Sequence, residues 1–216
     1  MKKELIVSAI VVLLIGIIGL VYASQIEAGA PIYKGWNLLY SFSSPDQLSG
    51  HLEKSHIKAI YAFIPTTQEY ARVYPNPENS KIDKIGDGYL EKTAFWVYSD
   101  YQTGETLNGM YNGDEYMAQE PLPLNDLPLY SGWNFVAILP EMIGKTFNEL
   151  KGSCIITKVY WWQPREQKFI SVDLSSSEVL RAQQNVGSGM IVKVVNNCKM
   201  GASSDASNVN PLSIPN

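Results

Sequence analysis

Residues 33–39 read Tyr-Lys-Gly-Trp-Asn-Leu-Leu, and residues 130–136 read Tyr-Ser-Gly-Trp-Asn-Phe-Val. The shared Gly-Trp-Asn core is typical of a strand entrance. Glycine permits a tight bend, tryptophan supplies a large buried surface, and asparagine bonds to nearby backbone. Two further blocks recur in the same order: an aromatic run ending in proline (60–65 and 159–164) and a closing apolar run (94–98 and 189–194). We therefore predict an internal duplication.

Each repeat predicts a β-rich module of about 70 residues, a size that buries too little surface alone. Proline ends the aromatic strand, so the polar stretches 66–69 and 165–168 are expected hairpin tips, followed by return strands at 70–74 and 169–172. Short helices are expected at 44–48, 146–150 and 175–184. The predicted fold class is α+β, mainly antiparallel β, with an N-terminal transmembrane or signal helix and two duplicated modules that pack together.

The N-terminus carries an apolar run, Leu5–Ala23, in which Ser8 is the only strongly polar residue. As a helix this run is about 28 Å long, close to the thickness of a bilayer core. Lys2 and Lys3 precede it, so the positive-inside rule keeps the N-terminus cytoplasmic and exports the remainder. Two interpretations stay open: a membrane anchor through residues 5–23, or a signal peptide cleaved after Ala23. The expected location is the cytoplasmic membrane with an extracytoplasmic domain, or secretion if the signal is cleaved.

The predicted organisation has five parts. They are a signal anchor or signal peptide at 1–23, a first module at 31–98, a linker or hairpin at 99–129, a second module at 130–200 and a flexible tail at 201–216. Prolines make the second half of the linker extended, and the small polar residues of the tail are typical of disorder.

Composition excludes some classes of protein. The 216 residues include 17 Lys+Arg and 21 Asp+Glu, for a net charge of −4. This acidic balance, without a basic cluster, argues against a nucleic-acid partner. A hydrophobic content of 45% excludes a disordered chain.

The order of the three blocks resembles the tandem Gly-Trp-Asn-motif, β-rich modules of exported and cell-surface proteins of bacteria and archaea. Those modules occur beside S-layer, adhesin-like or surface-enzyme domains and have no established activity. The closing strands here, Ala94-Phe95-Trp96-Val97 and Gly189-Met190-Ile191-Val192, depart from the Gly-Tyr-Trp-Val of that pattern. The resemblance implies a non-catalytic role at the cell surface.

The two cysteines, Cys154 and Cys198, both fall in the second module. An extracytoplasmic compartment permits a disulfide, which would staple that module alone and contribute about 4 kcal/mol in the chain-entropy model. Two free thiols in a reducing compartment are the alternative.

Recognisable catalytic or metal-binding patterns are missing from the sequence. His51 and His56 lie five positions apart, which is the wrong spacing for a helical metal pair, and the acidic stretch 83–91 lacks the spacing of a calcium loop. Glu69 and Glu166 lie in the two expected hairpin tips, where a repeated carboxylate indicates repeated turn chemistry more than catalysis. A hydrolase with paired carboxylates is therefore the least favoured interpretation. We predict no catalytic residue, no metal site and no cofactor.

The aromatic residues carry the remaining candidates. Trp36, Trp133 and Trp96 are expected in the repeat core. Trp161 and Trp162 are adjacent in a strand and so face opposite sides, which places one of them on an outer face or under a covering layer. The candidate ligand or partner surface consists of Trp161, Trp162, Tyr160 and Tyr70.

The leading predicted function is a non-catalytic extracytoplasmic surface protein, either structural or protein-binding, tethered by its N-terminal membrane helix. The alternative is a carbohydrate- or cell-wall-binding module that stacks sugars on exposed Trp and Tyr. The expected partners are the membrane, through residues 5–23, and a cell-surface protein or a glycan.

Overall fold

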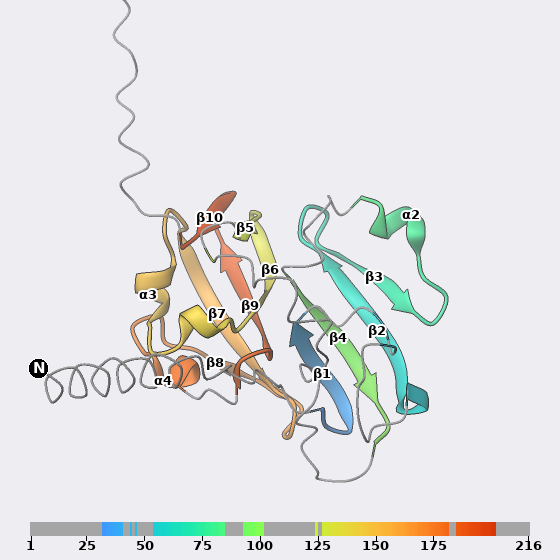
Figure 1. The fold of residues 1–216 in the computed structure, drawn as a ribbon. Helices are drawn as coiled ribbons and strands as arrows, with labels where there is room; N and C mark the ends of the chain where they lie inside the picture. Colours follow the sequence, from blue (N-terminus) through green and yellow to red (C-terminus); the bar gives the residue numbers. More distant parts are fainter. Residues whose placement is uncertain are drawn as a thin grey trace, which may run out of the picture.

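The computed structural model describes residues 32–40, 44, 46, 54–84, 93–101, 124, 127–181 and 185–201. These residues form three antiparallel sheets and a few short helices (Figure 1). The predicted β-rich, mainly antiparallel fold class is confirmed at this level.

Two four-stranded sheets have the same strand order. In each, the first strand pairs with the fourth, the fourth with the second, and the second with the third. The first sheet consists of β1 (Gly35–Tyr40), β2 (Ile57–Ile64), β3 (Glu69–Tyr74) and β4 (Ala94–Ser99). The second sheet consists of β6 (Gly132–Ala137), β7 (Ile156–Gln163), β8 (Lys168–Ser171) and β9 (Gly189–Val194). β1 and β6 begin within a repeated block of the sequence, as do β4 and β9, whereas β2 and β7 begin three residues before theirs.

The helices are single turns. α3 (Phe147–Leu150) begins at the predicted position, where Thr146 and Glu149 form a capping box. α4 (Glu178–Arg181) lies inside the expected stretch 175–184. The sequence did not predict α2 (Asn79–Ile82), or the 3-10 turns η2 (Lys54–His56) and η4 (Pro140–Met142). Of the helix expected at 44–48, only residues 44 and 46 are described.

Successive side chains of a strand point to opposite faces of its sheet. Neighbouring apolar residues therefore enter two separate cores, and each sheet is apolar on both faces. In β4, Phe95 and Val97 enter a core on the outer face of the first sheet, while Ala94 and Trp96 point toward the second sheet. In β9, Met190 and Val192 enter the outer core of the second sheet. Both sheets are thus buried between their own covering segments and the opposite sheet.

A cluster between the two sheets joins them. Phe63 and Phe135 stack with ring centroids 4.7 Å apart. A side chain at Gly189 would overlap Leu38, so glycine is needed for this close approach. The hydroxyl of buried Thr93 donates to the Phe135 carbonyl at 3.0 Å, which adds a polar contact between the sheets. The buried members of the cluster are Leu38, Phe63, Ala94, Phe135 and Trp162.

The outer face of the second sheet is covered by α3 and α4, which lie on the side away from the first sheet (Figure 1). Phe147, Leu150 and Leu180 from these turns are buried in the outer core. A short pair of strands, β5 (Leu127–Leu129) and β10 (Cys198–Met200), extends the same core.

The predicted disulfide is present and joins Cys154 to Cys198. Cys198 follows β9 and begins the additional strand β10. The disulfide therefore ties the pair β5–β10 to the segment that leads into β7.

Several expectations concern residues beyond the described ones. The predicted anchor or signal peptide at 1–23 lies wholly outside them, as do residues 102–123 of the linker and 202–216 of the tail. Within the described ranges, no helix has the length and apolarity needed to span a bilayer.

Replacing both cysteines with serine should lower the free energy of unfolding by up to about 4 kcal/mol, because the disulfide closes a loop of 44 residues. Urea denaturation of the full chain with and without Cys154→Ser/Cys198→Ser measures the difference. Wild-type protein treated with a reductant should shift by a similar amount. Equal stability of the variant and the oxidised wild type would contradict a stabilising role.

Candidate functional site

The Gly-Trp-Asn motif builds the entrance of β1 and of β6 in the same way. Asn37 is fully buried; its Oδ1 accepts from the Tyr33 backbone N–H and its Nδ2 donates to the Tyr33 carbonyl, both at 2.8 Å. Asn134 repeats these bonds to Tyr130 at 2.8 and 2.7 Å. Each asparagine thereby closes the turn that positions the preceding tryptophan.

The free edge of each sheet is occupied by a glutamine from the other sheet. The Gln167 amide accepts from the Trp36 backbone N–H at 2.7 Å and donates to the Trp36 carbonyl at 2.8 Å. Reciprocally, Gln68 accepts from the Trp133 N–H at 2.8 Å and donates to its carbonyl at 3.0 Å. A side-chain amide carries one acceptor and a donor, so it pairs with an edge residue as a neighbouring strand would.

The glycine before each tryptophan makes room for this pairing. Gly35 and Gly132 have φ of 97° and 100°, in the region that L side chains rarely adopt. A Cβ on Gly132 would stand 2.7 Å from Gln68 Oε1, and one on Gly35 would overlap Gln167 in the same way. The motif therefore combines strand entry with a docking point for the opposite sheet.

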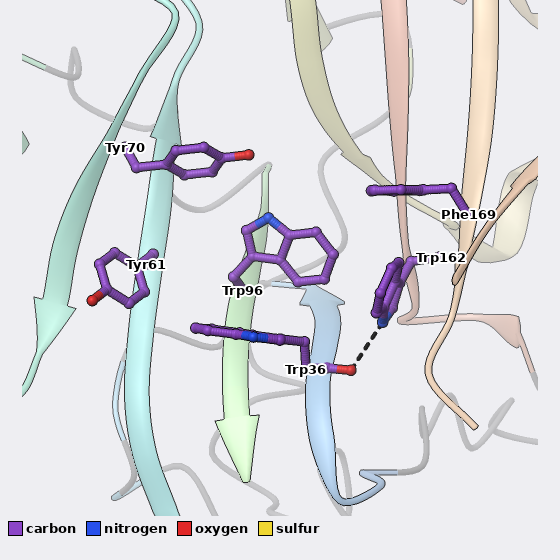
Figure 2. Close-up of a pocket in the computed structure, with 6 residues that line it drawn as sticks. All are labelled: Trp36, Tyr61, Tyr70, Trp96, Trp162 and Phe169. Atoms are coloured by element: carbon purple, nitrogen blue, oxygen red, sulfur yellow. Dashed lines mark hydrogen bonds between the residues drawn. The ribbon is translucent and has the colours of Figure 1, made fainter. Parts of the chain in front are cut away.

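Beside this docking point lies an aromatic cleft of about 440 Å³ between the two sheets (Figure 2). It is lined by one aromatic side chain from each strand of the first sheet, and by one each from β7 and β8 of the second sheet. The lining residues are Trp36, Tyr61, Tyr70, Trp96, Trp162 and Phe169.

The rings of the cleft meet mostly edge to face. Trp96 and Trp162 have centroids 4.9 Å apart at 88°, and Trp162 and Phe169 have centroids 4.9 Å apart at 68°. Trp36 and Trp96 lie 6.1 Å apart at 75°. Each such pair stabilises the arrangement by about 0.5–1.5 kcal/mol beyond burial, so the walls of the cleft are preorganised.

The polar atoms of the cleft differ in their availability. Trp162 Nε1 donates to the Trp36 carbonyl at 2.9 Å, and the same carbonyl also accepts from Gln167. Among the described residues, no protein acceptor is bonded to Trp96 Nε1 or to the Tyr70 hydroxyl. Figure 2 shows that hydroxyl pointing across the cleft, with the Trp96 nitrogen on the side that faces Tyr70. The Trp36 indole N–H and the Tyr61 hydroxyl also have no bonded partner among the described residues, and Figure 2 shows the Tyr61 hydroxyl directed away from the other rings.

The positions equivalent to those of the cleft differ in the second sheet. The register of β6 with β9 places Ile191 where Trp96 stands in the first sheet, and Lys193 where Tyr98 stands. The lysine Nζ lies 5.4 Å from the Trp133 ring centroid, a cation–π contact that covers that tryptophan. The two halves of the molecule therefore differ at positions that face each other across the interface.

The structure separates the four predicted candidate residues. Tyr70 and Trp162 line the cleft, with exposed fractions of 49% and 8%. Tyr160 lies on the same face as Trp162 but packs beside Trp133, 6.0 Å between centroids. Trp161 faces the opposite side, packs against the outer core and donates to Ser188 Oγ at 3.4 Å.

The three tryptophans expected in the repeat core are partly buried and pack against the cluster between the sheets. Trp36 and Trp96 also line the cleft, whereas Trp133 does not.

Sequence reasoning missed Tyr61 and Phe169 as lining residues, and Gln68 and Gln167 as docking residues. One signal for the glutamines was available. Both occur at the third position of the polar stretches 66–69 and 165–168, 99 residues apart, which is the offset of the aromatic blocks that precede them.

Two carboxylates outside the cleft, Glu166 and Asp100, are engaged in local contacts. A hydrogen bond from Lys168 holds the pKa of Glu166 below its ordinary value. The strand register pairs Glu69 in position with Lys168, so the two glutamates are not structural equivalents. His56 Nδ1 lies 2.7 Å from Asp100 Oδ1, and this bond is the main cause of the lowered pKa of Asp100. Within the described ranges, no three His, Cys, Asp or Glu residues gather as a metal site would require.

Comparisons with family models, with curated proteins and with solved structures found no match for this chain.

Replacing Gln68 or Gln167 with alanine should each lower the free energy of unfolding by about 1 kcal/mol, because each leaves an edge N–H and carbonyl without a partner. Urea denaturation of the full chain measures the loss, and the double variant should show the sum. Thr67→Ala and Arg165→Ala are matched controls, since both side chains are exposed in the same turns. Their effects should stay within about 0.5 kcal/mol. Glutamine variants no less stable than these controls would refute the edge-pairing role.

Proposed function

We propose that this chain is an exported, non-catalytic binding protein made of two duplicated modules, with its ligand site in the aromatic cleft between the sheets. The cleft is the observation that carries the proposal. Its volume of about 440 Å³ falls in the range of ligand sites, about 300–1,000 Å³. Its walls supply aromatic surfaces and hydrogen-bond donors, which suit recognition.

Exposure of apolar surface at the cleft supports binding. Tyr70 and Phe169 stand at its opening with exposed fractions of 49% and 42%. Large aromatic side chains that are exposed to water at a concave site are unfavourable, because apolar surface in water raises the free energy. Contiguous apolar patches of this kind mark sites for partners. Tyr and Trp also supply most of the energy in binding hot spots.

The chemistry of the lining favours binding over turnover. Every lining side chain among the described residues is aromatic, and none of these is a carboxylate, histidine, thiol or aliphatic hydroxyl that would serve as a base or nucleophile. The two sheets share their strand order and their edge pairing, which together give a rigid frame. Within this frame, the aromatic residues that differ between equivalent positions of the two sheets line the cleft.

Trp96→Ile should abolish ligand capture, because isoleucine is the residue at the equivalent position of the second sheet and removes both ring and N–H. The full chain, immobilised, is screened against a random-peptide library and a glycan array. The matched control is Trp161→Phe, which changes a neighbouring indole on the opposite face of β7. For a ligand of the cleft, binding to Trp96→Ile should be at least tenfold weaker than binding to wild type, and binding to the control should be unchanged.

The outcome against the proposal is equally defined. If every captured peptide or glycan binds Trp96→Ile and wild type alike, the cleft is not the ligand site. Circular dichroism of both variants establishes that the sheets are intact before binding is compared.

Export is proposed from the apolar run at 5–23. In a bacterial host, the full chain should sediment with membranes, resist a carbonate wash and be digested by protease added outside spheroplasts. A chain that begins at Ser24 and is soluble outside the cytoplasmic membrane would support the cleaved form of the same proposal. Recovery of the intact chain in the cytoplasm would overturn it.

A further inference from the structure

We infer that the ligand of the aromatic cleft is a proline-rich polypeptide segment in the polyproline II conformation. This inference rests on the proposed function and deepens it by naming the class of partner. It depends on three features of the cleft: which polar atoms are free, how the rings are arranged, and where the opening lies.

The first argument is complementarity of partial charge. Among the described residues, the indole N–H groups of Trp36 and Trp96 and the Tyr70 hydroxyl have no protein partner, while the Trp36 carbonyl already accepts two hydrogen bonds. The indoles can only donate and the tyrosine hydroxyl can donate or accept, so the site offers more donors than acceptors. A proline-rich segment offers the reverse, because proline keeps its carbonyl but has no backbone N–H. Its carbonyls are fully free in the polyproline II helix, which has no internal hydrogen bonds.

The same argument disfavours a sugar. Each sugar hydroxyl is both donor and acceptor, and removing its donor from water without a partner costs about 1–3 kcal/mol. In the described part of the lining there is no Asp, Glu, Asn or Gln side chain, so the tyrosine hydroxyls are the side-chain acceptors for such donors. A glycan buried here would have fewer acceptors for its hydroxyls than it has in water.

The arrangement of the rings also suits prolines. Edge-to-face rings at Trp36, Trp96 and Trp162 make notches between planes instead of one flat platform. A sugar stacks on a flat face, whereas pyrrolidine rings insert between aromatic ridges, which is how proline-rich segments are generally recognised. The notched shape therefore selects for the narrower ligand.

The opening of the cleft indicates how the segment enters. Tyr70 from β3 and Phe169 from β8 stand on opposite sides of it, one from each sheet (Figure 2). An extended segment passing between them contacts Trp96 and Trp162 behind. Because polyproline II is already ordered in the free peptide, binding it costs little conformational entropy.

The test is calorimetric titration of the full chain with a proline decamer, a glycine–serine decamer, a cellulose hexasaccharide and a chitin hexasaccharide. We expect saturable binding of the proline decamer alone. Trp96→Ile should weaken it at least tenfold and Tyr70→Phe about two- to tenfold, the loss of one hydrogen bond. Phe169→Ala, at a position 42% exposed, is a second variant that should weaken binding without disturbing the fold. Trp161→Phe should leave it unchanged.

Two results overturn the inference, and they are distinguishable. If a hexasaccharide or the glycine–serine decamer binds and depends on Trp96 while the proline decamer does not, the ligand class is wrong and the cleft remains the binding site. If no probe binds, and no library ligand depends on Trp96 either, the proposed function fails together with the inference.

Discussion

The structure depends on one constraint: each four-stranded sheet is apolar on both faces, but segments of its own half of the chain cover only the outer face. Alternate residues of β4 enter different cores, Phe95 on the outer side and Ala94 on the side of the other sheet. A solvent-exposed inner face would leave Leu38, Phe63 and Phe135 in water, at a cost of about 1.5–3 kcal/mol for each fully exposed side chain. The two sheets must therefore pair, and the glutamine amides of Gln68 and Gln167 determine the relative placement by binding the edge backbone.

A paired arrangement of two similar sheets produces two similar ends, and the side chains at equivalent positions make these ends differ. Phe63 and Ile191 fill the positions that correspond to Trp162 and Trp96, so smaller side chains replace two indoles at one end. The Trp162 indole lines the cleft and also donates to the Trp36 carbonyl, which phenylalanine cannot do. The frame is thus shared by the two halves, while the two indoles, one from each sheet, lie at one end of the interface.

The repeated blocks made the strands predictable, since Gly-Trp-Asn and the aromatic run before proline are local signals that mark strand entry and strand end. The short helix at 146–150 was predictable from similar local signals, and the pairing of Cys154 with Cys198 from the presence of two cysteines in the chain. The cleft was not, because it depends on which sheet faces which. Adjacency showed that Trp161 and Trp162 face opposite sides, but only the packing of the sheets shows that Trp162 meets Trp96. Short single-turn elements such as α2 carry no periodic signal and were missed.

The position of the cleft links binding to the pairing of the sheets. Its walls come from both sheets, and the Trp36 carbonyl that receives Trp162 is also held by Gln167. A ligand that contacts Tyr70 and Phe169 together binds the paired state and has no such site on separated sheets. Mass action then requires that the ligand stabilise the pairing by RT ln(1 + [L]/Kd). The reverse also holds: any change that loosens the edge pairing lowers the affinity of the proposed site for its ligand, even when every aromatic ring stays in place. The edge glutamines are therefore positioning residues for that site.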